Sequence, residues 1–424
     1  MRVRTATVAV TAVTALLASC LPPEPALPPP LLCSMPPCSW QRVGALLDSA
    51  VRAQAAPGGV VAVSYRGHRY TYGAGRLGLD DPTRPTEQTL YDLASLTKVV
   101  ATTSLAMIAA NQGHLALDSP VTRYVPAFQG AGKEDVTIRH LLTHTSGLRP
   151  DLPVWRRAAD ARAALALINT TPLDSPPGRR VAYSDLGAIV LGQAIERALG
   201  RRLDYLAHAY IFSPLKMRRT RFRPPDSWLP RVAPTEYDTA WRKRIVRGEV
   251  HDEKAAFLGG VAGHAGLFGT AEDLLSFGEW MLQLVEETQP TPSTPREQWL
   301  ARRARNACNL TGIDRRPLCP SDRLRWYARE FTRRQELVPG SSRALGWDTP
   351  TTGSSAGTRL DPSSFGHTGF TGTSLWIDPT RHLVIVLLTN RVHPVRSNSG
   401  HVPLRIAVAD LVAAIVDSTR TAAR

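Results

Sequence analysis

Lysine is scarce in this chain of 424 residues, and aromatic residues make up only 7% of it. Arginine therefore supplies nearly all of the basic charge behind the formal net charge of +15. No basic run is interleaved with aromatic residues, which argues against a nucleic-acid partner. Arginine-rich coding in a GC-rich genome is the favoured explanation of the charge, and attraction to an anionic cell envelope is the alternative. The five lysines are Lys98, Lys133, Lys216, Lys243 and Lys254.

Cysteine is also rare, with five residues in the whole chain. Cys33 and Cys38 form one close pair in the sequence, and Cys308 and Cys319 form another. In an oxidising compartment each pair can close a short disulfide loop, and free thiols are the alternative. No histidine lies near either pair at ligand spacing, so we expect no zinc site there.

The N-terminal apolar stretch is short. It follows two arginines and runs for about fifteen residues, which is too few to span a bilayer and fits a signal peptide over residues 1–19. Small residues before Cys20 resemble a bacterial lipoprotein cleavage box, so we expect a lipid on Cys20; a plain signal peptide with an incidental cysteine is the alternative. Residues 20–39 are rich in proline and predict a tether. The expected location is the periplasm or outer cell envelope, with membrane contact through the lipid anchor.

Residues 40–424 predict one folded domain. Strand patterns occur in the regions of about 40–114 and 341–424, whereas the region of about 115–340 is helical and rich in loops. Strands near both ends predict one antiparallel sheet that is assembled from both ends of the chain. The predicted fold class is α/β (α+β), an antiparallel sheet flanked by helices with a mostly helical inserted region.

Individual segments carry clear signatures within this plan. Residues 58–67 and 68–75 predict two strands joined by an Arg-Gly turn, and residues 365–379 and 382–391 predict a second antiparallel pair. Residues 287–340 hold clusters of proline and arginine and indicate a variable insertion.

One of the few lysines lies in an apolar segment. Between Leu96 and Ala110 the one charged residue is Lys98, and Ser95 precedes it by three positions. Residues three apart share one face of a helix, so the amine can reach the hydroxyl. Burial would lower the pKa of Lys98 toward the neutral amine, which can act as the base for a serine nucleophile. The alternative is a lysine that extends from the first turn of a core helix to solvent.

Two further motifs follow in order along the chain. AYSD places Tyr183 just before a predicted helix, and GHTGFTG places His367, Thr368 and Gly369 on a predicted strand. Together with the serine–lysine motif, this ordered set resembles the serine β-lactamase and penicillin-binding-protein superfamily. Its order is S-x-x-K, then Y-x-N or S-x-N, then K-T-G or H-T-G. The intervals resemble those of the class C-like branch, which contains carboxylesterases and D-alanyl-D-alanine carboxypeptidases.

Two longer segments carry the same resemblance. HLLTHTSGL, at residues 140–148, is a frequent signature of this branch. Residues 248–277 are similar to a subgroup of envelope hydrolases known as penicillin-binding-protein-like carboxypeptidases. The resemblance covers nearly everything from Trp40 onward. It implies a β-lactamase/transpeptidase-like fold and a reaction that needs no cofactor and no metal ion.

The resemblance also implies catalytic roles. Ser95 would be the acylated nucleophile and Lys98 its base partner. Tyr183 would be a second proton shuttle, either deprotonated or hydrogen-bonded to Lys98.

Substrate contacts would come from the third motif. His367 stands where the family often has lysine, and it would face the substrate carboxylate or the Tyr183 oxygen. Thr368 would hydrogen bond to substrate. The oxyanion hole would consist of the backbone N–H groups of Ser95 and of Phe370, just past the turn at Gly369.

Two positions depart from the family pattern. Asp185 stands where β-lactamases usually have asparagine, so it cannot donate an amide N–H to substrate but can pair with Lys98. This change should impair β-lactam turnover more than acylation by esters or peptides. His367 is charged only part of the time near neutral pH, so its carboxylate recognition should weaken as pH rises.

Other histidines allow several interpretations. His251, Asp252 and His264 lie in a glycine-rich segment, where stabilisation of a loop is the favoured role. Substrate contact, chiefly by His264, and metal binding are the alternatives. His140 and His144 are four residues apart, but no acidic third ligand is near them in the sequence, which favours a structural role over zinc.

The sequence thus predicts an exported serine hydrolase that forms an acyl-enzyme on Ser95. The favoured substrate is a D-Ala-D-Ala cell-wall peptide, and a small acyl ester or amide is the alternative. A non-catalytic protein that binds penicillin or wall peptides is a third possibility, against which the survival of all three motifs argues.

Overall fold

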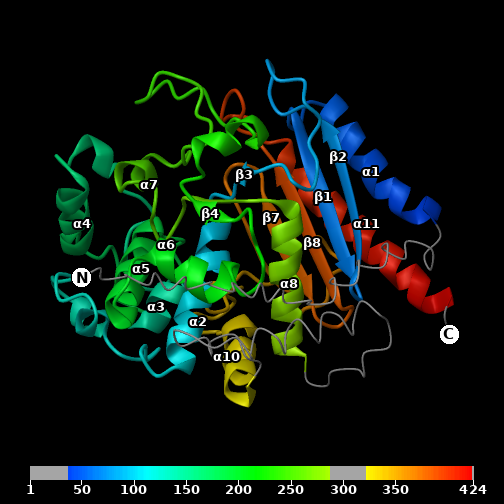
Figure 1. Cartoon of the computed structure of the whole chain (residues 1–424). Coiled ribbons are helices and arrows are strands. Elements are labelled where there is room, and N and C mark those ends of the chain that lie inside the picture. Colours follow the sequence, from blue (N-terminus) through cyan, green and yellow to red (C-terminus); the bar gives the residue numbers. More distant parts are fainter. Residues whose placement is uncertain (1–36, 287–320, 423–424) are drawn as a thin grey trace, which may run out of the picture.

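A five-stranded antiparallel sheet forms the framework of the computed structural model, which describes residues 37–286 and 321–422 (Figure 1). The strand order is β2-β1-β8-β7-β6, so strands from both ends of the chain lie side by side. β1 pairs with β8 from Gly59↔Thr389 to Tyr65↔Leu383. The predicted assembly of one sheet from both ends is confirmed. The strands are β1 (Gly58–Tyr65), β2 (His68–Gly75), β6 (Phe365–Thr368), β7 (Ser374–Asp378) and β8 (Leu383–Thr389).

Helices cover both faces of this sheet. Because side chains alternate along a strand, Val61 and Val63 face one side, whereas Val60 and Ala62 face the other. The first side packs against α1 and α11, which Figure 1 shows next to each other, and the second packs against α8. These helices are α1 (Pro37–Arg52), α8 (Ala271–Val285) and α11 (His401–Ala422).

A mostly helical region lies beside the sheet and shares the apolar core of its α8 side (Figure 1). Its α-helices are α2 (Ser104–Asn111), α3 (Ile138–Leu142), α4 (Ala161–Thr170), α5 (Asp185–Leu199), α6 (Leu203–Ala207), α7 (Glu253–Phe257) and α10 (Asp322–Thr332). Two π-helices cover Lys98–Thr103 and His208–Phe212. Short 3₁₀ helices cover Val121–Arg123, Lys133–Asp135, Val154–Arg156 and Asp226–Arg231.

A second sheet of three short strands brings distant segments to the same place. Its order is β3-β5-β4, with Asp92 paired to Phe268 and Arg221 paired to the same residue from the other side. The segment that leads into Ser95 is therefore held against the glycine-rich segment that ends near residue 267. The strands are β3 (Tyr91–Asp92), β4 (Arg221–Phe222) and β5 (Leu267–Gly269).

Helix ends follow the sequence signals. The Ser184 side chain accepts a hydrogen bond from the Gly187 N–H at the start of α5, and Gly200 ends that helix in the left-handed conformation with a φ of 69°. Thr270 caps α8 in the same way as Ser184 caps α5. Serine, threonine and glycine are the residue types typical of these positions, so the ends of α5 and α8 follow from the local sequence.

Three details differ from the sequence prediction. The segment 365–379 forms two strands, β6 and β7, with a tight turn between them, instead of one strand. α8 belongs by sequence to the predicted helical region of 115–340 but packs on the main sheet. α1 begins at Pro37, three residues before the predicted start of the domain at residue 40.

Several predictions concern parts of the chain outside the described residues. The signal peptide, Cys20, Cys33, Cys308 and Cys319 all lie there, and the side chain of Cys38 is likewise outside the description. No helix in the described ranges is long and apolar enough to cross a membrane.

Candidate active site

Ser95 follows a strained turn. Ala94 has a φ of 46°, a left-handed conformation that is unfavourable for a residue with a side chain. The buried Asp92 stabilises this turn, because its Oδ1 accepts a hydrogen bond from the Ala94 N–H at 2.8 Å. Its Oδ2 accepts a hydrogen bond from the backbone N–H of His251 at 2.6 Å. The turn exposes Ser95 in part, between buried neighbours on both sides.

Lys98 opens the π-helix and points back at Ser95. Its Nζ lies 2.9 Å from Ser95 Oγ, 2.8 Å from Asp185 Oδ1 and 3.1 Å from the backbone oxygen of His264. The residue is only 3% exposed, so the alternative of a lysine that extends to solvent is wrong. The three contacts can use all three hydrogens of an ammonium group.

The protonation state of Lys98 differs from the sequence expectation. Burial alone lowers the pKa of Lys98, but the neighbouring Asp185 and Tyr183 outweigh it and leave that pKa above its ordinary value. Burial alone raises the pKa of Asp185, but Lys98, His264 and Lys254 bring it down to about 2. The expected neutral amine is therefore wrong for the unliganded site. The reason is the carboxylate of Asp185, which makes a buried ion pair.

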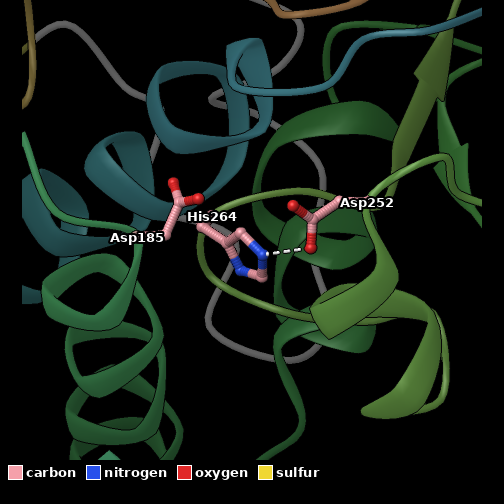
Figure 2. Close-up of side chains that lie close together, drawn as sticks. All are labelled: Asp185, Asp252 and His264. Carbon is pink, nitrogen blue, oxygen red and sulfur yellow. Dashed lines mark hydrogen bonds and ion pairs between the residues drawn. The ribbon is translucent and has the colours of Figure 1, made fainter. Parts of the chain in front are cut away.

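Asp185 is shared with a second lysine. Lys254 Nζ lies 3.3 Å from Asp185 Oδ2, 3.1 Å from Asp252 Oδ2 and 2.9 Å from Asp151 Oδ1. Asp252 in turn contacts the Nε2 of His264 at 2.8 Å, as Figure 2 shows. The result is a row of alternating charges that runs from Lys98 through Asp185 and Lys254 to Asp252, with the His264 ring hydrogen-bonded at its end.

The ligand atoms of Asp185, Asp252 and His264 lie within 4.8 Å of one another. Two lysine amines already neutralise the carboxylates of this group, which disfavours a divalent cation. The His264 side chain is 1% exposed and points to Asp252, so its contribution to Lys98 comes from the backbone carbonyl. The geometry thus supports the loop-stabilising role, and direct substrate contact by the His264 ring stays a prediction.

Tyr183 lies among four nitrogen-bearing side chains. The Nζ of Lys98 is 4.9 Å from the centre of its ring, and the guanidinium carbon of Arg343 is 5.3 Å away. The ring of His144 packs against it with centroids 4.5 Å apart, and His367 lies at 5.9 Å. The His144 Nδ1 also accepts a hydrogen bond from the Ser184 N–H, so His144 holds the segment that carries Tyr183.

His367 is buried and neutral. Its Nδ1 donates to the Thr368 carbonyl at 2.8 Å, which leaves Nε2 as an acceptor without a partner among the described residues. Burial, with the charges of Arg343 and Lys98, lowers the pKa of His367 to about 3. The expected partly charged histidine, with carboxylate recognition that weakens as pH rises, is therefore wrong. The physical reason is the lack of solvent around the ring and the presence of two nearby cations.

Arg343 was not among the residues expected in the site. Its Nη1 is buried and makes no hydrogen bond in the described part of the chain, although the group lies over the Tyr183 ring. Arg343 therefore offers the positive charge that His367 lacks. Nothing in the sequence near Arg343 distinguishes it from the other arginines. For Lys254 the sequence does contain a signal: lysine is so rare in this chain that a lysine close to Asp252 could have been considered as a site residue.

The turn between β6 and β7 lies directly against the Ser95 segment. Thr371 Oγ1 donates to the Asp92 carbonyl at 2.7 Å, and Thr373 Oγ1 donates to the Leu93 carbonyl at 3.1 Å. Gly369 permits this approach, because a Cβ there would lie 2.5 Å from the Leu93 oxygen. Phe370 follows at the tip of the turn, and its side chain is 48% exposed.

Two backbone donors are left free by this arrangement. Neither the Ser95 N–H nor the Phe370 N–H donates a hydrogen bond to another described residue. Both groups were predicted to form the oxyanion hole. Backbone donors without an internal partner are what an oxyanion hole requires. Thr368, which directly precedes the turn, is partly exposed at the same end of β6.

The sequence has clear relatives. The family model described as Beta-lactamase matches residues 43–410. A protein of Escherichia coli (strain K12) named "Putative D-alanyl-D-alanine carboxypeptidase" is 30% identical over 352 residues, which are 75% of this chain and 73% of that protein. A protein of Salmonella typhi with the same name is 30% identical over 348 residues, covering 74% of this chain and 72% of the relative.

Solved structures share the fold. EstCE1, a hydrolase with promiscuous acyltransferase activity, superposes with a TM-score of 0.65 at 22% identity and covers 89% of this chain and 98% of its own. A class C β-lactamase from Rhodobacter sphaeroides superposes with a TM-score of 0.64 at 20% identity and covers 88% of this chain and 99% of its own. The predicted β-lactamase/transpeptidase-like fold is confirmed.

Proposed function

The chain belongs to the Beta-lactamase family, and from this premise we propose that it is an exported serine hydrolase that trims D-Ala-D-Ala peptides of the cell wall. Ser95 attacks the peptide carbonyl and forms an acyl-enzyme, and water then releases the acyl group. The carboxypeptidase name of the relatives at 30% identity supports this choice of substrate.

One observation carries the proposal: the Nζ of a buried lysine lies 2.9 Å from the hydroxyl of Ser95. A lysine is costly to bury without a partner, and Lys98 is held as a cation beside the serine by its ion pair with Asp185. The free N–H groups of Ser95 and Phe370 add the means to stabilise an oxyanion. The turn that carries Phe370 contacts the segment that leads into Ser95, which supports the assignment of both N–H groups to one oxyanion hole.

The charge state of Lys98 directs the proton to Tyr183. A protonated Lys98 uses its hydrogens on Ser95, Asp185 and the His264 carbonyl, so it cannot accept the serine proton. We assign the proton to the oxygen of Tyr183 in its deprotonated form, because the cations Lys98 and Arg343 lie 4.9 Å and 5.3 Å from the centre of its ring. As the Ser95 Oγ–carbon bond forms and the peptide C–N bond breaks, the same proton passes to the leaving D-alanine amine.

The cation that faces the substrate carboxylate is Arg343 in this proposal. His367 stays neutral and offers its free Nε2 as an acceptor to a substrate N–H. Thr368 and Gly369 place the strand edge along the substrate, and Phe370 covers it.

A carboxylesterase is the second candidate function. Asp185 lacks the amide donor that helps to orient the amide carbonyl of β-lactams, and an ester, with its better leaving group, depends less on that contact. The structural neighbour EstCE1 is a hydrolase with acyltransferase activity. Small p-nitrophenyl esters are the probes for this function.

Four measurements on purified protein test the choice: release of D-alanine from a D-Ala-D-Ala peptide, p-nitrophenyl ester hydrolysis, nitrocefin hydrolysis, and covalent labelling by penicillin. The variant is Ser95→Ala, and the matched control is Ser418→Ala, which replaces an exposed serine of α11. We expect Ser95→Ala to lose at least about a thousandfold in rate and all labelling. Turnover that survives Ser95→Ala would sink the proposal, and labelling without turnover would favour the non-catalytic binding protein. Ester turnover without peptide turnover would favour the esterase.

We also propose that the enzyme is anchored in the cell envelope by a lipid on Cys20. The sequence around Cys20 supports this proposal. A Cys20→Ser variant should leave the membrane fraction and lose labelling by radioactive palmitate, whereas Ser19→Ala should keep both. Membrane association that persists in Cys20→Ser would contradict lipid anchoring.

A further inference from the structure

A buried arginine from α11 reaches the turn that follows β6. Arg405 is 7% exposed, and its Nη2 donates to the Gly369 carbonyl at 2.6 Å and to the Thr373 carbonyl at 2.7 Å. No carboxylate within the described ranges pairs with Arg405, and its Nε has no partner there either. The arginine thus serves two carbonyl groups of a single turn.

The positive charge of Arg405 makes its burial energetically unfavourable. Lack of solvent and the charge of Arg391 lower the pKa of Arg405 to about 9, so the group is still a cation at neutral pH but is held at an energetic disadvantage. A buried cation without a counter-ion destabilises a fold, so its presence calls for a role other than stability. The hydrogen bonds of Arg405 point to the turn after β6 as the place of that role.

The Gly369 carbonyl and the Phe370 N–H belong to the same peptide group. A cation that hydrogen bonds to the oxygen of a peptide withdraws electron density from its nitrogen, and the N–H becomes a stronger donor. We propose that Arg405 is a positioning residue of the oxyanion hole, which polarises the Gly369–Phe370 peptide so that the Phe370 N–H binds the developing oxyanion more strongly. This inference rests on the proposed acylation of Ser95.

Other hydrogen bonds hold this turn in place, so Arg405 is not needed for its position alone. Thr371 and Thr373 hold the turn against the Asp92 and Leu93 carbonyls without any charge. Arg391 donates from Nε to the Phe370 carbonyl at 2.7 Å, but that carbonyl belongs to the next peptide group. The Gly369 carbonyl also accepts a hydrogen bond from the neutral Gly372 N–H at 3.1 Å, so Arg405 is the charged donor to the peptide whose N–H faces the substrate.

The test is a graded series at one position. Arg405→Lys keeps the charge, Arg405→Gln keeps a neutral donor, and Arg405→Met keeps only the apolar stem. Arg381→Met is the matched control, because Arg381 also ties α11 to the sheet, through Asp417 and Asp378, but at the far end. Each folded variant is acylated with penicillin that carries ¹³C at the reacting carbonyl. The acylation rate and the infrared stretching frequency of the acyl carbonyl are then measured.

We expect acylation of Arg405→Gln and Arg405→Met to slow by about 10- to 100-fold, which is less than the loss of a whole oxyanion donor. Their acyl carbonyl band should move to higher wavenumber, because a weaker hydrogen bond withdraws less electron density from the carbonyl. Arg405→Lys and Arg381→Met should stay within about threefold of the natural enzyme in rate and keep its band position.

Failure of this inference and failure of the proposed function give different results. An unchanged band in Arg405→Gln and Arg405→Met would overturn the inference while leaving Ser95 as nucleophile. Unfolding of Arg405→Gln while Arg381→Met stays folded would assign Arg405 to stability and overturn it as well. A natural enzyme that never forms the acyl-enzyme would overturn the proposed function itself.

Discussion

At the scale of single residues, the Asp185 carboxylate is shared by two buried amines. Lys98 contacts Oδ1 at 2.8 Å, and Lys254 contacts Oδ2 at 3.3 Å. Because the carboxylate is ionised, Lys98 keeps its proton and acts as a cation beside Ser95 and Tyr183. Asp185, which departs from the common family pattern, thus makes Lys98 a cation instead of a neutral base.

Asp185→Asn should release Lys98 from this pair. Without the carboxylate the pKa of Lys98 falls, so the alkaline limb of the pH profile of kcat/KM should move to lower pH. The new amide donor should also raise nitrocefin or penicillin hydrolysis about tenfold relative to ester hydrolysis. Asp151→Asn is the control, because Asp151 pairs with Lys254 from a largely exposed position. Penicillin hydrolysis unchanged by Asp185→Asn would contradict this account.

Arg343→Gln should affect substrates according to their charge. Loss of the cation should raise KM for a D-Ala-D-Ala peptide about tenfold, equal to roughly 1.4 kcal/mol, and leave KM for a neutral ester within about twofold. Because His367 stays neutral above its pKa of about 3, KM for the peptide should not change between pH 5 and 8. Arg334→Gln, which removes contacts to Thr349 and Pro350, is the control. Equal effects on both substrates would disprove a role in carboxylate binding.

At the scale of elements, the site depends on short irregular segments. Lys98 stands on a π-helical turn, a rare geometry that often occurs at functional sites. Side chains from this segment also secure the loop opposite, since Thr102 Oγ1 donates to the Gly263 carbonyl and Thr97 Oγ1 accepts from the Leu267 N–H. Irregular backbone is thus held in place by hydrogen bonds at both ends.

Gly369→Ala should separate the turn after β6 from the Ser95 segment. A Cβ at this position would lie 2.1 Å from Thr373 Oγ1 and 2.5 Å from the Leu93 oxygen, so the turn must move. We expect kcat to fall about 100-fold, because one oxyanion donor moves away, with a loss of about 1–3 kcal/mol in the free energy of unfolding. Gly187→Ala, where a Cβ meets atoms only at 3.7 Å, serves as the control. A Gly369→Ala enzyme with normal kcat would show that the turn carries no oxyanion donor.

At the scale of the whole molecule, the site lies where the turn after β6, the π-helical segment and the start of α5 meet. Its groups are buried, and burial together with the charges of Arg343 and Lys98 keeps His367 neutral. Burial, with the charges of Arg343 and Lys98, lowers the pKa of His144 well below its ordinary value, and burial with Arg405 and Arg391 lowers the pKa of His401 to about 3. Buried neutral histidines tie stability to pH.

The free energy of unfolding should fall as pH drops below about 6.5. In that range the unfolded chain binds protons at His367 and His401, whereas the folded chain does so only near pH 3. Each of these two histidines should remove about 2 kcal/mol by pH 5. Burial raises the pKa of Asp273 to about 6, so protonation of Asp273 increases the free energy of unfolding as pH falls. Variants are therefore needed to separate the contribution of each group.

The measurement is urea unfolding at pH 7, 6 and 5 for the natural protein, for His401→Gln and for His114→Gln, which replaces an exposed histidine. His401→Gln should lose stability less steeply as pH falls, by about 2 kcal/mol between pH 7 and 5. An identical pH dependence in both variants would exclude His401 as a source.

The sequence by itself determined β1, β2 and β8, the helix caps of α5 and α8, and the serine–lysine spacing that lets one side chain reach the other. These features depend on neighbours within a few positions along the chain, where backbone geometry sets the distances. Only the tertiary structure decided that Lys98 is charged, that His367 is neutral, and that Arg343, Lys254 and Arg405 join the site. Protonation depends on burial and on charges from segments far apart in the sequence, and no local pattern contains that information.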